Sequence, residues 1–320
     1  RITRPSRRPI SSRGWLCALR TASKRKSAIN RLSPGEAAFG IVVYGTLIFF
    51  TLACLFPFVN TLANAFSSSN AIQTGKVLLW PVEFQWDSMR MILADNSVIR
   101  ALLVTVYLTA VGTALNLFFT VITAYPLSRR DLKWRGLFMK FMVITMLFSG
   151  GMIPLFLLVK SLHLLNTLWA LILPGLISAF NVIIMKSFFQ ALPDELREAS
   201  IVDGCGNIRY LVQVVLPLSG ASLATIGLFY AVGHWNSYFG AVLYIDNPDL
   251  LTLQVKLRNI LLLSQMDTSM EQMTMQSNFT VIQESLKAAV IVVATVPILV
   301  VYPFLQKYFV KGSLLGSVKG

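Results

Sequence analysis

Charged residues are scarce in this chain of 320 residues. Only 13% of them are Asp, Glu, Lys or Arg, whereas 55% are hydrophobic. In soluble domains about a quarter of the residues are charged, because the surface of such a domain is in contact with water. The shortage of charge therefore excludes an ordinary soluble domain and indicates a protein of the lipid bilayer.

Cysteine and histidine are also rare, with three and two residues. Cys17, Cys54 and Cys205 form no CxxC pair and no Cys/His cluster, so neither a disulfide bond nor a metal site is expected. The two histidines have no neighbouring Ser or Asp in a pattern that would build a catalytic constellation. These shortages argue against a membrane enzyme.

A nucleotide-binding loop is missing. ATP use needs a Gly-rich segment of the form GxxxxGK(S/T), whose backbone N–H groups cradle phosphates, and no segment of the sequence matches it. We therefore expect this chain to bind no cofactor. A stand-alone ion-coupled transporter is also disfavoured, because it would need acids within its spans, and nearly all the acidic residues lie in loops or at helix ends.

Long hydrophobic runs are what the sequence does contain. A membrane-spanning helix needs roughly 20 mostly apolar residues. Six segments meet this condition, at 38–62, 101–125, 137–159, 168–185, 218–238 and 288–305. We expect one six-helix membrane domain over 36–306, flanked by a basic tail at 1–35 and a second tail at 307–320.

Basic residues predict the orientation of these spans. Lys and Arg are frequent in the first 31 residues, which contain no acid, and Arg129, Arg130, Lys133 and Arg135 fill one connection. By the positive-inside rule both tails are expected in the cytoplasm. The same rule accounts for most of the net charge of +14, which disfavours a nucleic-acid-binding protein. Residues 62–65 (LANA) look like a signal-peptidase site, but the apolar run before them is too long for a cleaved signal peptide.

Residues 190–217, between the fourth and fifth spans, form a polar interruption on the predicted inner side. Pro193 followed by Asp194 and Glu195 is typical of a helix start. Gly204 and Gly206 permit the positive φ angles of a tight turn, after which a second short helix is expected over 207–215. A helix-turn-helix at the membrane surface is the favoured interpretation, and a plain solvated loop is the alternative.

The first of these two helices is expected to offer a shallow surface. Leu196, Ala199 and Ser200 are spaced at i, i+3 and i+4, so they share one face of the helix. The two smaller side chains would let the backbone of another protein come close.

The spacing of these residues resembles a known motif. Glu198-Ala199-Ser200, then Gly204 after three residues, then Val-Val-Leu-Pro after nine more, is similar to the EAA loop (E-A-A-x3-G-x9-I-x-L-P) of binding-protein-dependent ATP-binding-cassette (ABC) importer permeases. Ser200 and Val214 replace Ala and Ile. Wider similarity covers residues 36–320. Segments such as "SGGMIPLFLLV" and "KYFVKGSLLGSVKG" resemble carbohydrate-uptake permeases of the maltose type, nearest the branch for uronic-acid-containing saccharides such as alginate.

The resemblance implies an all-α membrane protein of six transmembrane helices with the type I ABC importer permease fold. It also implies that residues 190–217, here called the coupling loop, contain a cytoplasmic coupling helix. This helix is expected to dock in a cleft of a separate ATPase subunit. The residues implied in this coupling are Glu195, Glu198, Ala199, Ser200, Asp203, Gly204, Leu216 and Pro217.

The partners implied are a second homologous permease in a heterodimer, two ATPase subunits that bind ATP and Mg²⁺, an external solute-binding protein and a saccharide. The expected location is the inner membrane of a bacterium. The EAA motif concerns the contact with the ATPase subunit and says nothing of the transported solute, here called the cargo. A permease for a different solute is therefore the alternative. A stand-alone secondary transporter is the weaker alternative.

Polar and aromatic residues within the spans predict a substrate pathway. Such side chains face the bundle interior or an aqueous cavity rather than lipid, and amides and aromatic rings suit sugars. The candidates are Asn116, Asn181, Tyr230, Trp235, Asn236 and Tyr238, with Thr145 and His234 of similar character. The alternatives are anchoring at the membrane interface and internal packing.

Glycine and proline predict bends in two spans. Ser149-Gly150-Gly151 with Pro154 lies in the third span, and Pro174-Gly175 lies in the fourth. Such bends line a pathway or serve close helix packing, and the sequence leaves both open.

The connection at 246–283, expected outside, is longer than a turn needs and is rich in Met and Gln. The resemblance implies that this loop reaches into the cleft of the solute-binding protein. The residues implied in that contact are Gln254, Gln265 and Gln276. A flexible tether is the alternative.

Overall fold

The computed structural model describes residues 34–271, 285–301 and 303. Every regular element within these ranges is helical. The tails predicted at 1–35 and 307–320 therefore lie almost entirely outside the described residues, as does the stretch 272–284 of the predicted outer loop. The chain divides into two compact units, residues 1–59 and 60–320, and each is described by itself.

The described part of the first unit belongs to one helix, α2 (Pro34–Ala65). Its side chains are mostly large, apolar and exposed, as Phe39, Tyr44 and Phe49 illustrate. The stretch Ala38–Ala65 is long and apolar enough to cross a membrane, in agreement with the first predicted span.

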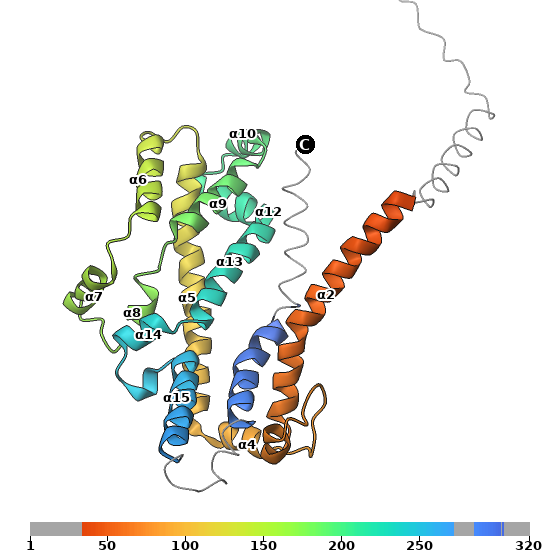
Figure 1. The fold of residues 1–320 in the computed structure, drawn as a ribbon. Helices are drawn as coiled ribbons and strands as arrows, with labels where there is room; N and C mark the ends of the chain where they lie inside the picture. The colour runs from red at the N-terminus through yellow and green to blue at the C-terminus, as the bar shows by residue number, and fades with distance from the viewer. Residues whose placement is uncertain (1–33, 272–284, 302, 304–320) are drawn as a thin grey trace, which may run out of the picture. The chain divides into compact units, whose positions relative to one another are not determined.

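The second unit is built around α5 (Asn96–Ser128), a helix of 33 residues. Asp95 caps its start by accepting a hydrogen bond from the Ser97 N–H at 2.8 Å. α9 (Ala179–Gln190) and α13 (Gly220–Trp235) pack along α5, as Figure 1 shows. α5 meets the length and composition of a membrane span, and it corresponds to the second predicted span.

The bends predicted from glycine and proline are present. α6 (Arg135–Leu147) and α7 (Met152–Ser161) are inclined at 110° across a break where Gly151 has φ +85°. α8 (Trp169–Ile172) is separated from α9 by residues 173–178, which include Pro174. The third and fourth predicted spans are therefore each divided into two helices, because Gly and Pro interrupt the backbone hydrogen bonds there.

A third bend, of 83°, separates α13 from the helical segment Asn207–Leu218 that precedes it. By length and hydropathy, the described residues contain two helices that can cross a membrane, or up to four spans if each strongly bent pair is one. The segment Ser285–Val301 is a shorter apolar helix that overlaps the sixth predicted span and begins three residues before it.

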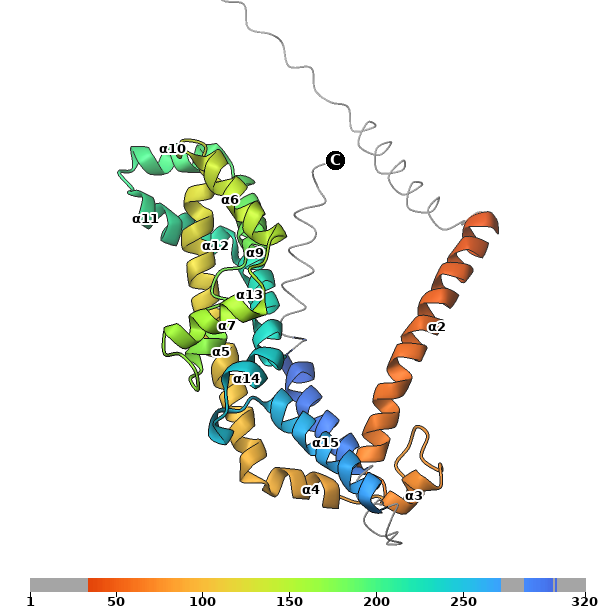
Figure 2. The same cartoon turned by 60° about the vertical axis from the view of Figure 1, so that its left-hand side comes forward.

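Several elements lie at the end of the second unit that contains the start of α5. They are α3 (Ser69–Gln73), α4 (Asp87–Ala94), the turn Pro248–Leu250 and the longer helix α15 (Leu253–Glu271), whereas α14 (Phe239–Tyr244) packs against α8. Figure 2 shows α4 and α15 near this end. Met89, Trp235, Leu253 and Ala289 share one buried cluster here, so α4, α13, α15 and the last described helix pack together.

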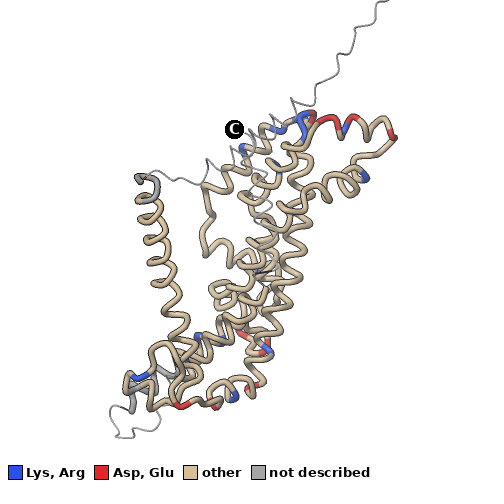
Figure 3. Tube along the Cα trace, turned by 90° about the vertical axis from the view of Figure 1, so that its right-hand side faces the viewer, with Lys and Arg blue, Asp and Glu red and all other residues tan. Residues whose placement is uncertain are grey.

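Charges in the second unit gather at its two ends, with a long uncharged stretch between them, as Figure 3 shows. Arg129 and Asp131 follow the last residue of α5, and Arg100 lies near its start, where it pairs with Asp249. This distribution is what a membrane-embedded bundle requires, because only its ends meet water and lipid headgroups.

Candidate functional site

The coupling loop contains two helical arms joined by a glycine turn. The first arm is α10 (Asp194–Val202), which begins after Pro193. Gly204 has φ +72°, and the Cys205 N–H donates to the Ser200 carbonyl at 2.9 Å, so the turn closes the end of α10. The second arm runs through α11 (Asn207–Tyr210), a π-helical turn (Leu211–Val215) and α12 (Leu216–Leu218). The predicted helix-turn-helix is therefore confirmed.

The coupling residues are divided between two faces of the loop. Glu195, Glu198, Ala199, Asp203 and Gly204 are exposed, and so is Pro217 in α12, whereas Leu216 is half-buried. Ser200 differs, because it is only 7% exposed and its hydroxyl donates to the Arg197 carbonyl at 2.7 Å. The structure therefore places Ser200 on the inner face of α10, and Ala199 alone of the Ala-Ser pair faces solvent.

The exposed side of the loop carries apolar side chains that sequence reasoning missed. Val202 is 87% exposed and Ile208 79%, and Ile201 and Val212 are also exposed. Exposed apolar side chains on a polar loop are of the kind that a partner protein can cover. These Ile and Val residues are visible in the sequence of the loop, but only the fold shows which way they point.

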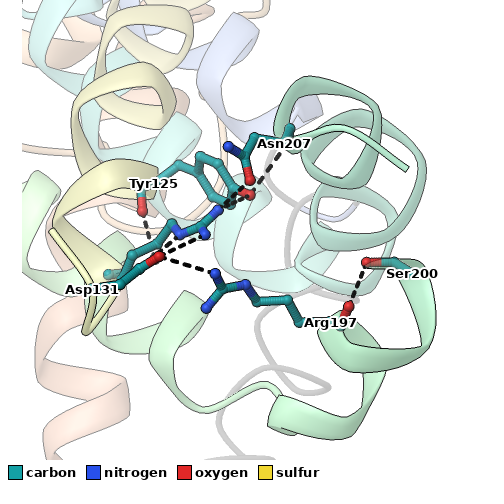
Figure 4. A network of polar contacts seen from close by, with 7 residues as sticks. Tyr125, Asp131, Arg197, Ser200 and Asn207 are labelled. Atoms are coloured by element: carbon teal, nitrogen blue, oxygen red, sulfur yellow. Dashed lines mark hydrogen bonds and ion pairs between the residues drawn. The ribbon is translucent and has the colours of Figure 1, made fainter. Parts of the chain in front are cut away.

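A polar network ties this loop to the connection that follows α5 (Figure 4). Arg129 donates from Nε and Nη2 to the two carboxylate oxygens of Asp131, at 3.1 and 2.9 Å. Arg197 of α10 donates to the same carboxylate at 3.0 Å. The remaining Nη1 of Arg129 donates to the side-chain oxygen of Asn207, the first residue of α11.

Two further contacts reinforce the network. The Tyr125 hydroxyl donates to the Asn207 carbonyl at 3.3 Å, and the Gln190 amide donates to the Ser128 carbonyl at 3.1 Å. Both join α5 to segments of the coupling loop more than 60 residues away in sequence. A sequence pattern could not reveal these pairs, because neither partner stands in a local motif.

The charges in this network are strongly stabilised. Hydrogen bonds from Arg129, and to a smaller extent from Arg197, hold the pKa of Asp131 well below its usual range. The same contact with Asp131 raises the pKa of Arg129. Arg129 is the more enclosed partner, with 16% of its side chain exposed against 56% for Asp131. The pair therefore stays fully charged throughout the neutral range.

A groove of about 580 Å³ lies beside the network. Its walls include Tyr125, Arg129, Arg197, Glu198 and Tyr210, which come from α5, α10 and α11 and from the residue that follows α5. The groove is thus a feature of the junction between α5 and the coupling loop. In the part of the chain that the structure describes, no three His, Cys, Asp or Glu side chains lie close enough to hold a metal ion.

A second polar cluster lies at the middle of α5, where several predicted pathway residues meet. Asn116 is fully buried and donates to the carbonyls of Gly175 and Leu176, at 2.7 and 3.0 Å. Its side-chain oxygen lies 2.7 Å from Nε2 of His234, which is the donor because an amide oxygen can only accept. Asn116 thus joins α5 to α13 and to the break between α8 and α9.

Tyr230 makes a parallel connection. Its hydroxyl lies 2.8 Å from that of Thr120 and accepts the Ser178 N–H at 3.1 Å. Side chains of α5 and α13 therefore satisfy three backbone groups of the irregular stretch 173–178, in keeping with the need to pair non-helical backbone within a membrane. These two pathway candidates are engaged with their own chain.

Among the described residues, the other pathway candidates make no side-chain hydrogen bond to Asn116 or Tyr230. Asn181 is buried in the first turn of α9. Trp235 belongs to the buried apolar cluster near the start of α5. Asn236 is exposed, and Tyr238 is half-buried with the Arg258 guanidinium 4.9 Å from its ring centre. Thr145 is exposed and bonds only its own helix.

The candidates for contact with a solute-binding protein are only partly described. Gln254 is half-buried in the first turn of α15. Gln265 lies within the same helix, and Gln276 lies outside the described residues.

Comparison with known proteins decides the family. The family model described as "Binding-protein-dependent transport system inner membrane component" matches residues 116–313, more than half of the chain. The chain belongs to this family. This permease therefore has the type I importer fold that the EAA resemblance implied, in an all-helical membrane protein.

Individual relatives agree over nearly their whole length. The permease is 47% identical over 283 residues to the polygalacturonan/rhamnogalacturonan transport system permease protein YtcP of Bacillus subtilis (strain 168), which covers 88% of this chain and 98% of the relative. It is 46% identical over 266 residues to Protein LplC of the same organism, covering 83% and 90%. Among solved structures, a bacterial ABC transporter involved in the import of the acidic polysaccharide alginate matches with a TM-score of 0.79, 30% identity and coverage of 87% and 99%.

Family membership settles the class of activity. The permease is a non-catalytic membrane component of an ABC importer, and ATP hydrolysis belongs to a separate ATPase subunit. A binding-protein-dependent system also includes a solute-binding protein. The location is a bacterial membrane.

Proposed function

We propose that this permease forms half of the translocation pathway of an ATP-driven importer for oligosaccharides or polysaccharides, including uronate-containing chains such as alginate. The observation that carries the proposal is the 47% identity, over 98% of its length, to a permease of a polygalacturonan/rhamnogalacturonan transport system. The structural match to a transporter of an acidic polysaccharide supports the same class of cargo.

In this proposal the exposed side of the coupling loop docks on an ATPase subunit. Val202 and Ile208 supply apolar contact area, and Glu195 and Glu198 supply acidic groups for basic or polar partners. Ala199 leaves room for close approach. The permease pairs with a second, homologous permease, and two ATPase subunits hold ATP and Mg²⁺, so this chain itself binds no cofactor.

The membrane orientation follows from the charge at the two ends of the second unit. The coupling loop and both tails face the cytoplasm, and the loop 246–283, with Gln254, Gln265 and Gln276, faces the solute-binding protein. Of the pathway candidates, Asn236 and Tyr238 keep the exposure that sugar contact requires. Asn116 and Tyr230 instead shape the pathway by holding the break at 173–178.

The test is the ATPase activity of the assembled complex in lipid. The cognate binding protein would deliver a panel of neutral and uronic oligosaccharides of several lengths. We expect the uronic oligosaccharides to stimulate hydrolysis and to be transported. If the complex is shown to be assembled and no saccharide stimulates it, the cargo is a different solute and the proposal is wrong.

A further inference from the structure

The two arms of the coupling loop are both fastened to one short segment of the chain. Asp131 binds Arg197 in α10, and Arg129 binds Asn207 in α11, so the contacts fall on either side of the Gly204 turn. The partners are 66 and 78 residues apart in sequence. We call Arg129, Asp131, Arg197 and Asn207 the Asp131 clasp.

The geometry of the clasp favours a rigid connection. Arg129 holds both oxygens of Asp131 in a two-pronged, charge-assisted contact, which fixes the direction of each group. The nearby pair Arg130–Asp194 joins the same two segments, but its charged atoms are 3.9 Å apart and the two side chains are 84% and 73% exposed. Such a surface pair contributes little, so Arg130 is a natural control for Asp131.

α5 connects the clasp to the break in the fourth span. Asn116 and Thr120 lie on α5, 13 and 9 residues before Arg129, or about 20 and 14 Å at the helical rise of 1.5 Å per residue. Asn116 binds the carbonyls of Gly175 and Leu176, and Thr120 binds Tyr230, whose hydroxyl receives the Ser178 N–H. One helix therefore carries the clasp at its end and the attachment of the break at its middle.

We infer that the Asp131 clasp is a positioning device that makes the coupling loop move together with α5, so that displacement of α10 reaches the break at 173–178 instead of being absorbed in the loop. This inference rests on the proposed function in one respect, the docking of the coupling loop on an ATPase. It does not depend on the nature of the cargo.

The first test is hydrogen exchange of the assembled complex, which needs no cargo. In Asp131→Asn, which keeps the size but removes the charge, we expect faster amide exchange in α10 and α11. ATP is expected to change exchange at residues 173–178 in the parent complex, and this change should shrink in Asp131→Asn. Asp131→Glu should restore it in part, and Arg130→Gln should behave like the parent.

The second test is the amount of solute transported per ATP hydrolysed. We expect Asp131→Asn to lower this ratio at least about fivefold, the lower range of measured coupling between sites, with Arg130→Gln unchanged. Exchange in α10 and α11 that stays as in the parent would overturn the clasp. A normal ATP response at 173–178 with a normal transport ratio would overturn its role in transmission. Failure of every saccharide to stimulate the parent complex would instead contradict only the proposed cargo.

Discussion

Asn116 uses both of its side-chain N–H donors and its side-chain oxygen toward its own chain, with two carbonyls and one imidazole as partners. The buried amide of Asn116 stabilises the fold by joining separate segments, because each buried carbonyl that lost this partner would cost about 1–3 kcal/mol of stability. Its neighbours are adapted to it. Gly112, one turn earlier on α5, leaves the space that the His234 ring occupies.

Replacing Gly112 by alanine should therefore disturb this cluster. The added Cβ would stand 2.5 Å from Nε2 of His234, and the ring cannot move away without losing its bond to Asn116. We expect Gly112→Ala to destabilise the permease by about 1–3 kcal/mol, seen as a lower apparent Tm in detergent. Gly233→Ala is the matched control, since its Cβ meets no atom within 4 Å. Equal melting of the two variants would contradict the close packing.

Replacing Asn116 by leucine tests the connector role. Gly175, Leu176 and His234 would all lose a partner in a dry environment, so we expect a loss of about 2 kcal/mol or more. Asn236→Leu serves as the control, because this exposed side chain bonds only the Val232 carbonyl of its own helix. The measurement is again the apparent Tm, and an Asn116→Leu protein as stable as the parent would show that the bonds of Asn116 are not needed to hold the break at 173–178.

At the scale of elements, α10 and α11 owe their relative direction to the turn between them. Gly204 has a positive φ, whereas Gly206 lies in extended backbone with φ −70°. Only the first of the two glycines is required by the conformation, because a side chain in the left-handed region costs about 1–2 kcal/mol. The turn and the clasp thus set the angle between the arms by two independent means.

Substituting the two glycines separately should distinguish their roles. We expect Gly204→Ala to weaken docking of the ATPase subunits about fivefold or more, because its strain is relieved by moving α10 away from α11. Gly206→Ala should dock normally. The measurement is the affinity of the permease for the ATPase subunits, obtained by titration, together with the retention of these subunits during purification. Normal docking by Gly204→Ala would mean that the turn is not part of the docking geometry.

Much of this local structure follows from sequence patterns, and some of it cannot. Hydrophobic runs, the Pro-Asp-Glu start of α10 and the glycine turn are local, so their signals stand within a few residues. The bond between Arg129 and Asn207 joins residues that only the tertiary fold brings together. The inward direction of Ser200 depends on what covers α10, and a helical spacing of i, i+3 and i+4 cannot tell the covered face from the free one.

At the scale of the whole molecule, the second unit has two polar ends separated by the length of α5. At 1.5 Å per residue, its 33 residues span about 50 Å. A bilayer is about 40–45 Å thick with its headgroups, so the two ends of α5 lie at opposite interfaces. The end with Arg129, Arg130, Lys133 and Arg135 is the more basic one. By the positive-inside rule we expect this end, and with it the coupling loop, in the cytoplasm.

Cysteine labelling tests this orientation without any knowledge of the cargo. In a variant with Cys17, Cys54 and Cys205 replaced by serine, Asp246→Cys and Lys133→Cys each introduce one exposed thiol at opposite ends of the second unit. We expect a membrane-impermeant maleimide to label Asp246→Cys in intact protoplasts and Lys133→Cys only after the membrane is opened. The side from which Lys133→Cys is labelled matters because an ATPase subunit uses cytoplasmic ATP and must therefore meet the coupling loop on the cytoplasmic side. If Lys133→Cys reacts from outside, the coupling loop cannot meet such a subunit, and the docking proposal fails with the orientation.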